Sequence, residues 1–429
     1  MSLTAAYQRL VRADRSDQTG DDQRATAYNG TRQLVANALQ ATGDQVINAK
    51  TVLPWLFAAL GVPSGFTAML VPIREAGSML PQAALVPWVE RTRRRRYLWV
   101  LGAAGQAVAA GAMAFAAATL SGAVAGFVVL AALTLFSLSR ALCSLAGKDV
   151  LGRTVPQGER GQINGLATVL SGAVAITLGL GIRLLGGESS NPAVLAVLLA
   201  VAAVLWLLAL TVFAGIREPH VDLGRSEARA GWARQSLRLF REDRTFARFV
   251  TARALLLVSA LSPPFVVALA AEAGGVSLSG LGPFIIAQGV ASLIGGRIFG
   301  RLADRNSRDL MTWGAAAASA LLTAFLLLLL VPAVRDSWVI YPVTYLLLAL
   351  IHTGVRVARK TYVVDMAEGD QRTEYVAVSN TAMGLILLAA GALSGGLALL
   401  GGEVALIFLA VLGLAGVVVS RTLPNVSKG

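Results

Sequence analysis

The sequence predicts an all-α membrane protein in which twelve transmembrane helices form two pseudo-symmetric six-helix bundles. Two observations lead to this prediction. Of the 429 residues, 55% are hydrophobic and only 14% are charged, whereas soluble domains carry roughly 25% charged residues. A short loop in which an acid precedes arginines also occurs twice, at 90–96 and at 304–308. In both copies a serine, Ser78 or Ser292, lies twelve residues before the acid, which indicates a duplicated bundle.

The expected elements are apolar runs of about 20 residues, the length that crosses a bilayer. The first bundle is expected to contain spans at 40–61, 64–89, 97–119, 122–147, 161–186 and 192–215. The second is expected to contain spans at 246–272, 279–302, 310–332, 338–361, 373–400 and 402–420. The chain then divides into a cytoplasmic tail (1–33), an N-terminal bundle (34–215), a cytoplasmic linker (216–245), a C-terminal bundle (246–420) and a second cytoplasmic tail (421–429).

The orientation follows from the positive residues, because arginine and lysine concentrate in cytoplasmic loops. They occur in alternate loops, and the intervening loops are nearly free of them apart from Arg335. Both termini are therefore expected in the cytoplasm, which requires an even number of spans. The net charge of +13 comes almost entirely from arginine. Its placement between apolar runs is typical of membrane topology rather than of nucleic-acid binding. The excess of arginine over lysine fits a GC-rich bacterial genome, so the expected location is a bacterial inner membrane.

The two longest polar segments allow more than one interpretation. In the linker 216–245, Trp232, Leu239 and Phe240 lie at helical spacing among charged residues, which is compatible with a helix on the inner membrane face. A flexible linker is an equally good interpretation. The N-terminal tail has a weaker pattern of the same kind, and there a disordered tail is the preferred interpretation.

The second acid–arginine loop resembles the loop that follows the eighth helix in transporters of the major facilitator superfamily. The matching residues are Gly300, Leu302, Asp304, Arg305 and Arg308. The match is not complete, because Ser307 replaces the usual glycine and Asp309 stands where a basic residue is common. In the first half only Glu90 and the arginines after it match, with Val86 and Trp88 at the glycine and leucine positions. The resemblance implies secondary transport by alternating access around a cavity between the bundles.

The loops themselves could hold the two halves in one conformational state. An acid at a helix end accepts hydrogen bonds from the positive N-terminus of a neighbouring helix, and such contacts can form in one state and break in the other. The candidate residues for this latch are Glu90, Arg91, Gly300, Asp304, Arg305 and Arg308. The alternative is that these residues only supply the cytoplasmic positive charge.

Charged residues inside the predicted spans are the candidate substrate and proton pathway, because an ionisable group at membrane depth usually has a partner and a function. They are Asp44, Lys50, Arg74, Glu75, Arg140, Arg253, His352 and Arg356. Adjacent helical residues point about 100° apart, so Arg74 and Glu75 are expected to pair with other helices. Lys50 is a candidate partner for Glu75, and an arginine for Asp44. A structural ion network without substrate contact is the alternative.

Proton coupling is suggested by a second resemblance. Arg140 matches the arginine of an R-x-x-q-G sequence that many proton-coupled members of the family carry in helix four, although Cys143 and Ser144 replace its last two residues. Asp44 and Glu75 are the candidate proton carriers. His352 occupies the position of Arg140 in the repeat and could shuttle protons. The alternatives are an Arg140 that reaches the membrane surface and a His352 that is a buried hydrogen-bonding residue.

Other function classes receive little support. The only cysteine and the two histidines cannot form a metal cluster, and no nucleotide-binding motif is present. We therefore expect no enzyme activity, cofactor or metal. We expect a monomer in the lipid bilayer that moves a small organic solute, coupled to protons, in a direction that the sequence does not indicate. A transporter-like sensor, a membrane enzyme and a multidrug efflux antiporter are the alternatives, and span five lacks the glycine–proline pair of drug antiporters.

Overall fold

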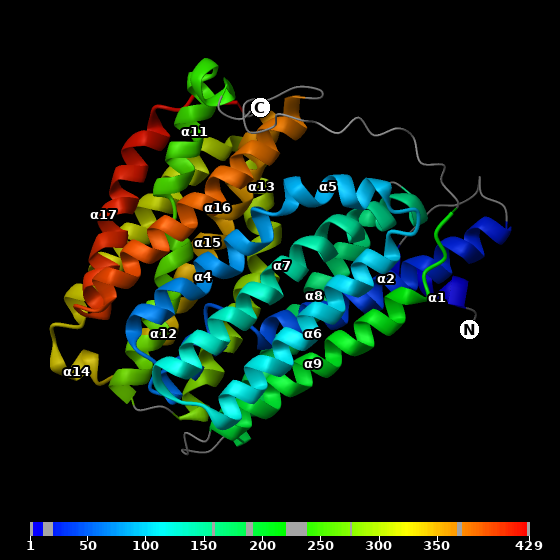
Figure 1. The fold of residues 1–429 in the computed structure, drawn as a ribbon. Coiled ribbons are helices and arrows are strands. Elements are labelled where there is room, and N and C mark those ends of the chain that lie inside the picture. Colours follow the sequence, from blue (N-terminus) through cyan, green and yellow to red (C-terminus); the bar gives the residue numbers. More distant parts are fainter. Residues whose placement is uncertain are drawn as a thin grey trace.

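The computed structural model describes residues 3–11, 20–156, 159–185, 192–219, 238–274, 277–366 and 371–426. Nearly all of these residues are helical, and no strand occurs among them. The helices form two groups, coloured from blue to green in the N-terminal half and from green to red in the C-terminal half (Figure 1). The predicted all-α fold is therefore confirmed for the described part of the chain.

The N-terminal half contains α1 (Leu3–Val11), α2 (Gly20–Val46), α3 (Val52–Ala59), α4 (Ser64–Met79), α5 (Gln82–Arg91), α6 (Arg96–Thr119), α7 (Gly122–Thr154), α8 (Arg160–Leu185) and α9 (Pro192–Ala214). The C-terminal half contains α11 (Arg244–Leu255), α12 (Val258–Gly274), α13 (Leu278–Leu328), α14 (Pro332–Arg335), α15 (Ile340–Asp365), α16 (Gln371–Ala398) and α17 (Gly402–Arg421). Three expected spans are each broken into two helices, and α13 contains two spans joined at a kink. The described helices thus supply six spans in each half.

The breaks have local causes. Between α2 and α3 the chain leaves the helix at 47–51, where the backbone N–H of Lys50 donates to Asn48 Oδ1 at 2.8 Å. Pro81 lies between α4 and α5, and proline cannot donate a helical hydrogen bond. In α13 the kink is at Asn306 (φ −158°, ψ 93°), whose Oδ1 accepts from the N–H of Asp309 at 3.0 Å and so caps the second span.

The first helix is longer than the sequence predicts. We expected a tail up to residue 33, but α2 begins at Gly20, and Leu3–Val11 is helical rather than disordered. The early part of α2 packs on the bundle: Asn29 Nδ2 donates to the Arg217 carbonyl at 2.9 Å, and Arg32 Nη1 donates to the Val212 carbonyl at 3.0 Å. Tyr7 of α1 is buried and donates its hydroxyl to Glu159 at 2.9 Å. Linker residues 220–237 lie outside the described residues.

The outer surface is apolar, as a bilayer requires. Eight helical segments are long and apolar enough to span a membrane, and two more apolar segments, Val169–Leu184 and Ser279–Gly295, are shorter. Large hydrophobic side chains such as Phe115, Phe127 and Val197 are more than half exposed. The two remaining spans are α2–α3 and α4–α5, which carry most of the N-terminal intramembrane charges. These charges lower the hydropathy of the two spans, which is why they are not among the ten apolar segments.

The two halves meet mainly along two helix pairs, α4 with α16 and α8 with the first part of α13, and α12 also contacts α3 and α4. Glycines allow these helices to approach closely. An ideal Cβ built on Gly282 would lie 2.6 Å from the Gly179 carbonyl oxygen. Ser64 Oγ also donates to the Ala398 carbonyl at 2.9 Å. These contacts lie toward the end of the molecule that carries Gly61, Gly122 and α14, which we call the far end. The other end, where Arg217 and Arg244 flank the linker, we call the linker end.

Candidate functional site

A cavity of about 330 Å³ lies between the two halves. Its N-terminal wall comes from the end of α2, the break before α3, α4 and α7, and its C-terminal wall comes from α12, α13 and α15. Seven of the eight charged residues and histidines singled out in the spans line it: Asp44, Lys50, Arg74, Glu75, Arg140, His352 and Arg356. The helix breaks described above therefore place charged side chains from different spans around one space.

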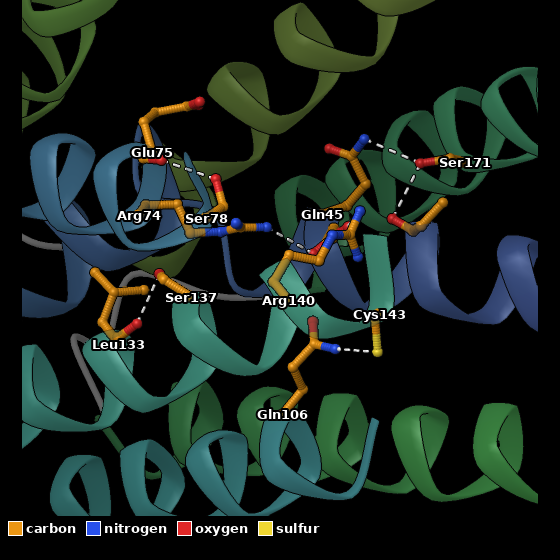
Figure 2. Close-up of polar contacts among 12 residues, drawn as sticks. Gln45, Arg74, Glu75, Ser78, Gln106, Leu133, Ser137, Arg140, Cys143 and Ser171 are labelled. Carbon is orange, nitrogen blue, oxygen red and sulfur yellow. Dashed lines mark hydrogen bonds and ion pairs between the residues drawn. The ribbon is translucent and has the colours of Figure 1, made fainter. Parts of the chain in front are cut away.

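The N-terminal wall is held together by a carboxylate between two arginines. Asp44 Oδ1 accepts from Arg74 Nη2 at 3.0 Å, and Asp44 Oδ2 accepts from Arg140 Nη2 at 2.8 Å. Figure 2 shows Arg74 and Arg140 converging from α4 and α7. The Arg74 guanidinium also lies 5.0 Å from the ring centroid of buried Phe136. The predicted pairing of Asp44 with an arginine is thus present, and it ties α2, α4 and α7 together.

Glu75 faces a different set of charges. It projects away from Arg74 and Arg140 (Figure 2), as expected for neighbouring positions on a helix. Among the described residues no cation lies within the 4.0 Å ion-pair distance of its carboxylate, so the predicted Lys50–Glu75 pair is not a direct contact. Lys50 and then Arg74 of its own half are nevertheless the strongest positive influences on Glu75, and Arg359 and Arg356 of α15 follow. Glu75 therefore lies in a field set by both halves.

The C-terminal wall combines one cation with neutral polar groups. Arg356 lies one turn after His352 on α15, and the His352 ring nitrogen Nδ1 is 3.3 Å from Ser259 Oγ. Buried Tyr345 donates its hydroxyl to Gln288 Oε1 at 2.8 Å. Sequence reasoning missed Tyr345, Gln288 and Arg359. An amide within a predicted span was the available signal for Gln288, and Arg359 is one turn from Arg356.

Arg253 is the exception among the predicted pathway residues, because it does not line the cavity. It is buried in α11, where Nη1 donates to Ser379 Oγ and Nη2 donates to Asn380 Oδ1, both at 3.0 Å. Ser379 and Asn380 belong to α16. The arginine therefore joins two helices of the C-terminal half, and the structure corrects its expected place in the cavity.

The latch residues are only partly described. The surroundings of Glu90, Gly300 and Asp304 are not among those that the structure describes, and Arg91 and Arg305 are exposed. Arg308 pairs with its neighbour Asp309 at 2.9 Å and donates to the Leu423 carbonyl at 3.4 Å. These contacts of Arg308 stay within the C-terminal half.

A different charged cluster, which the sequence reasoning missed, lies at the linker end of the N-terminal half. Asp149 of α7 pairs with Arg95 and, at 2.7 Å, with Arg153. The Glu218 carboxylate accepts from the backbone N–H groups of Arg95 and Arg96, the latter at 2.7 Å. A carboxylate at these positions favours the N-terminus of α6. The only sequence signal was the spacing of Asp149 and Arg153, which is the spacing of an ion pair on a helix.

Within the described residues no group of three histidine, cysteine, aspartate or glutamate side chains could hold a metal ion. Cys143 is buried, and its thiol donates to the Trp99 carbonyl at 3.2 Å. The polar character of the site therefore comes from the ion pairs and amides described above.

Comparison with known proteins agrees with this architecture. The family model of the Major Facilitator Superfamily matches residues 34–355. A mutant of the nucleoside transporter NupG superposes with a TM-score of 0.70 at 10% identity, covering 92% of this chain and 99% of that one. A D-xylose-proton symporter gives 0.67 at 13% identity, with 94% and 98% covered. The inward open conformation of the xylose transporter XylE from E. coli gives 0.65 at 12% identity, with 94% and 97% covered.

No curated protein sequence matches the chain. The structural likenesses, at such low identity, concern the fold, whereas the family model covers most of the chain. The family model therefore identifies a multi-pass membrane transporter. The chain belongs to the Major Facilitator Superfamily.

Proposed function

We propose that this protein is a secondary active transporter that moves a small organic solute across a bacterial inner membrane by alternating access, with proton coupling and both termini in the cytoplasm. One observation carries the proposal: charged side chains of both halves line a single cavity between them. A site at the interface of two bundles can be reached from either side when one bundle rocks against the other. The cavity is therefore the substrate site.

In the proposed cycle, contacts between the halves close the far end in this state. The halves are in contact there through Ser64 and Ala398, and the Arg183 guanidinium of α8 lies 5.0 Å from the ring centroid of Trp338 in the other half. In the opposite state these contacts would separate. The loops at 90–96 and 300–308 would then stabilise closure of the linker end, which is the latch role proposed for Glu90, Arg91, Gly300, Asp304, Arg305 and Arg308.

Glu75 is the better of the two proton-carrier candidates. Asp44 is held by two arginines, so its negative charge is compensated inside the N-terminal half. Glu75 has no direct ion pair among the described residues, and the cations that act on it come from both halves. Movement of the halves changes the distance to Arg356 and Arg359, and the affinity of a carboxylate for a proton depends on nearby cations. Rocking and protonation are thereby linked.

Thiol labelling tests alternating access without knowledge of the substrate. Cys143 is replaced by alanine, and Ser144, which lines the cavity, is replaced by cysteine. Membrane-impermeant maleimide is applied to right-side-out and inside-out vesicles. We expect Ser144→Cys to be labelled from both sides, because each side of the cavity opens in turn.

A cross-link sharpens this experiment. Joining Ser64→Cys to Ala398→Cys should fix the far end, so that labelling from the linker side persists and labelling from the far side is lost until the disulfide is reduced. The matched control joins Thr312→Cys to Ser420→Cys, whose native hydroxyls are 2.9 Å apart within one half. The control cross-link should change neither rate. Labelling from one side only in the protein without a cross-link, or far-side labelling that the far-end cross-link leaves unchanged, contradicts the proposed mechanism.

A further inference from the structure

We propose that the central cavity binds a small organic anion, with a carboxylate or phosphate group held between Lys50 of the N-terminal half and Arg356 of the C-terminal half. This inference rests on the proposed transport function and adds the chemical class of the substrate. Three features of the cavity carry it: its charge balance, the position of its cations and the nature of its remaining lining.

The charge balance of the lining is positive. Its ionisable side chains are two acids, Asp44 and Glu75, and four bases, Lys50, Arg74, Arg140 and Arg356, so the net charge is +2 with His352 neutral. A cleft with low-dielectric walls and a net charge of one sign concentrates the electric field and attracts ions of the opposite charge. The cavity therefore favours anions over cations before any specific contact forms.

The charges are not equally available. Arg74 and Arg140 share the carboxylate of Asp44 within one wall. Lys50 and Arg356 have no ion-pair partner within 4.0 Å among the described residues, and Glu75 is the one further acid that faces them. Arg359 adds positive charge beside Arg356. The single negative charge of Glu75 therefore cannot balance the positive charges of Lys50, Arg356 and Arg359. Lys50 and Arg356 are thus the two cations of the lining without a carboxylate partner, and Arg140 keeps one further nitrogen, Nη1, without a hydrogen-bond partner in the described part of the chain.

The positions of these two cations give the anion a role in the cycle. Lys50 lies in the break between α2 and α3, and Arg356 lies on α15 of the opposite half. Like charges repel each other more strongly as the halves approach, so closure around an empty cavity is opposed. An anion between them reverses the sign of this interaction. Binding then favours the closed state, which is the differential affinity that a ligand-driven transition needs.

The rest of the lining fits a small, oxygen-rich molecule. Asn48, Ser78, Gln82, Ser144 and Thr353 contribute amides and hydroxyls, which can pair with the hydroxyl or carbonyl groups of an organic acid. The volume of about 330 Å³ is at the lower end for ligand pockets. A bulky hydrophobic drug suits neither the size nor the polarity of this space.

Charged thiol reagents measure the field directly. Ser144→Cys, in the background without Cys143, is reacted with an anionic reagent (sulfonatoethyl methanethiosulfonate) or a cationic one (trimethylammonioethyl methanethiosulfonate). Each rate is divided by the rate of the same reagent with a small thiol in solution. We expect the anionic reagent to be faster. Lys50→Gln and Arg356→Gln should each lower the anion-to-cation rate ratio by about tenfold. Arg248→Gln, which removes an equal charge from an exposed position on α11, is the matched control and should leave the ratio unchanged.

The charge-conserving variants Lys50→Arg and Arg356→Lys show whether charge or folding is responsible, because they should keep the ratio of the parent protein. Binding is then followed by thermal unfolding at constant ionic strength with compounds of similar size: succinate, its neutral analogue succinamide, the cation butanediamine, and glycerol phosphate with glycerol as its control. Saturable stabilisation by succinate or by glycerol phosphate, lost in both glutamine variants, supports the proposal and tells the carboxylate from the phosphate class.

Three results overturn the proposal. The first is an equal or reversed reagent ratio in the parent. The second is stabilisation by succinamide, butanediamine or glycerol that equals stabilisation by the anions, and the third is that neither anion stabilises the protein. The anion proposal can fail in these ways while the transport mechanism holds, because Ser144→Cys would still be labelled from both sides. One-sided labelling would remove the transport function and this inference together.

Discussion

At the scale of single residues, the site is a contrast between two carboxylates thirty-one positions apart in the chain. Asp44 accepts hydrogen bonds from two arginines in its own half, while Glu75 is influenced by cations of both halves without a direct pair. The first arrangement is suited to holding helices together. The second is suited to a group that responds when the halves move.

Asp44→Asn should destabilise the protein. The substitution leaves Arg74 and Arg140 without a counter-charge in a largely buried position, which costs about 3 kcal/mol of unfolding free energy. Thermal unfolding in detergent should show a clearly lower midpoint. Asp309→Asn, which breaks a half-exposed pair with Arg308, is the control and should cost less than about 1 kcal/mol. Equal effects of the two variants would mean that Asp44 has no special structural role.

Glu75→Gln should separate coupling from binding. The neutral amide keeps the size of the side chain but cannot gain or lose a proton, so uptake driven by a pH gradient into proteoliposomes should be abolished. Exchange of unlabelled for labelled substrate at equal pH should continue. Unchanged gradient-driven uptake in this variant would remove Glu75 from the coupling role.

Charged residues could be found from the sequence because they are conspicuous in apolar spans, and seven of the eight candidates line the cavity. Arg253 was misplaced because a buried arginine can also be satisfied by neutral oxygens, here Ser379 and Asn380 of a neighbouring helix. Tyr345 and Gln288 were missed because uncharged polar residues are common in membrane helices and carry little information about which wall they face.

At the scale of elements, breaks and close contacts decide how the helices present the site. The interruption after α2 contains Lys50, so there a charged side chain and non-helical backbone occur together, whereas the interruption after α4 contains Pro81. Hydropathy found the spans because each is apolar, but it missed the start of α2. Residues 20–33 are polar, and they are helical because they pack on α1, α9 and the start of the linker, which the sequence pattern does not reveal.

Gly179→Val should push apart α8 and α13. A Cβ at Gly179 would meet Ile286 Cγ1 at 2.7 Å and the Gly282 carbonyl oxygen at 2.8 Å, and such overpacking costs about 1–3 kcal/mol. Because this contact joins the halves near the far end, the variant should also speed far-side labelling of Ser144→Cys. Gly181→Val on the same helix has no atom within 4 Å of its new Cβ and is the control. Equal far-side labelling rates in the Gly179 and Gly181 variants would contradict the idea that the contact between α8 and α13 opens at the far end.

At the scale of the whole molecule, two bundles share a polar interface inside an apolar shell. The cross-half ion pairs that a latch would need at the linker end do not occur among the described side chains, whereas Asp149, Arg95 and Glu218 stabilise that end of the N-terminal half alone. At the far end, by contrast, Ser64 contacts Ala398 and Arg183 lies against Trp338 of the other half. The repeated loop motif could predict that the chain forms two bundles, but it could not predict the conformational state of the protein.

Asp304→Asn tests the latch. If Asp304 stabilises closure of the linker end, its neutralisation should slow the conformational cycle several-fold, while the ranking of substrates in competition assays stays the same. Arg248→Gln again serves as a surface-charge control. A changed substrate ranking would show that the loop acts on the cavity and not on the halves.

The most direct test of the central claim is the distance between the halves at both ends, measured by pulsed electron spin resonance on paired nitroxide labels. One pair joins Arg94 to Arg421 at the linker end, and the other joins Thr119 to Val331 at the far end, all exposed positions. Thr119 with Leu184, both in the N-terminal half, is the control. We expect two populations at each end that change in opposite directions on ligand or proton binding, with one constant control distance. Single, unchanging distances at both ends in an actively transporting protein would contradict a rocking mechanism.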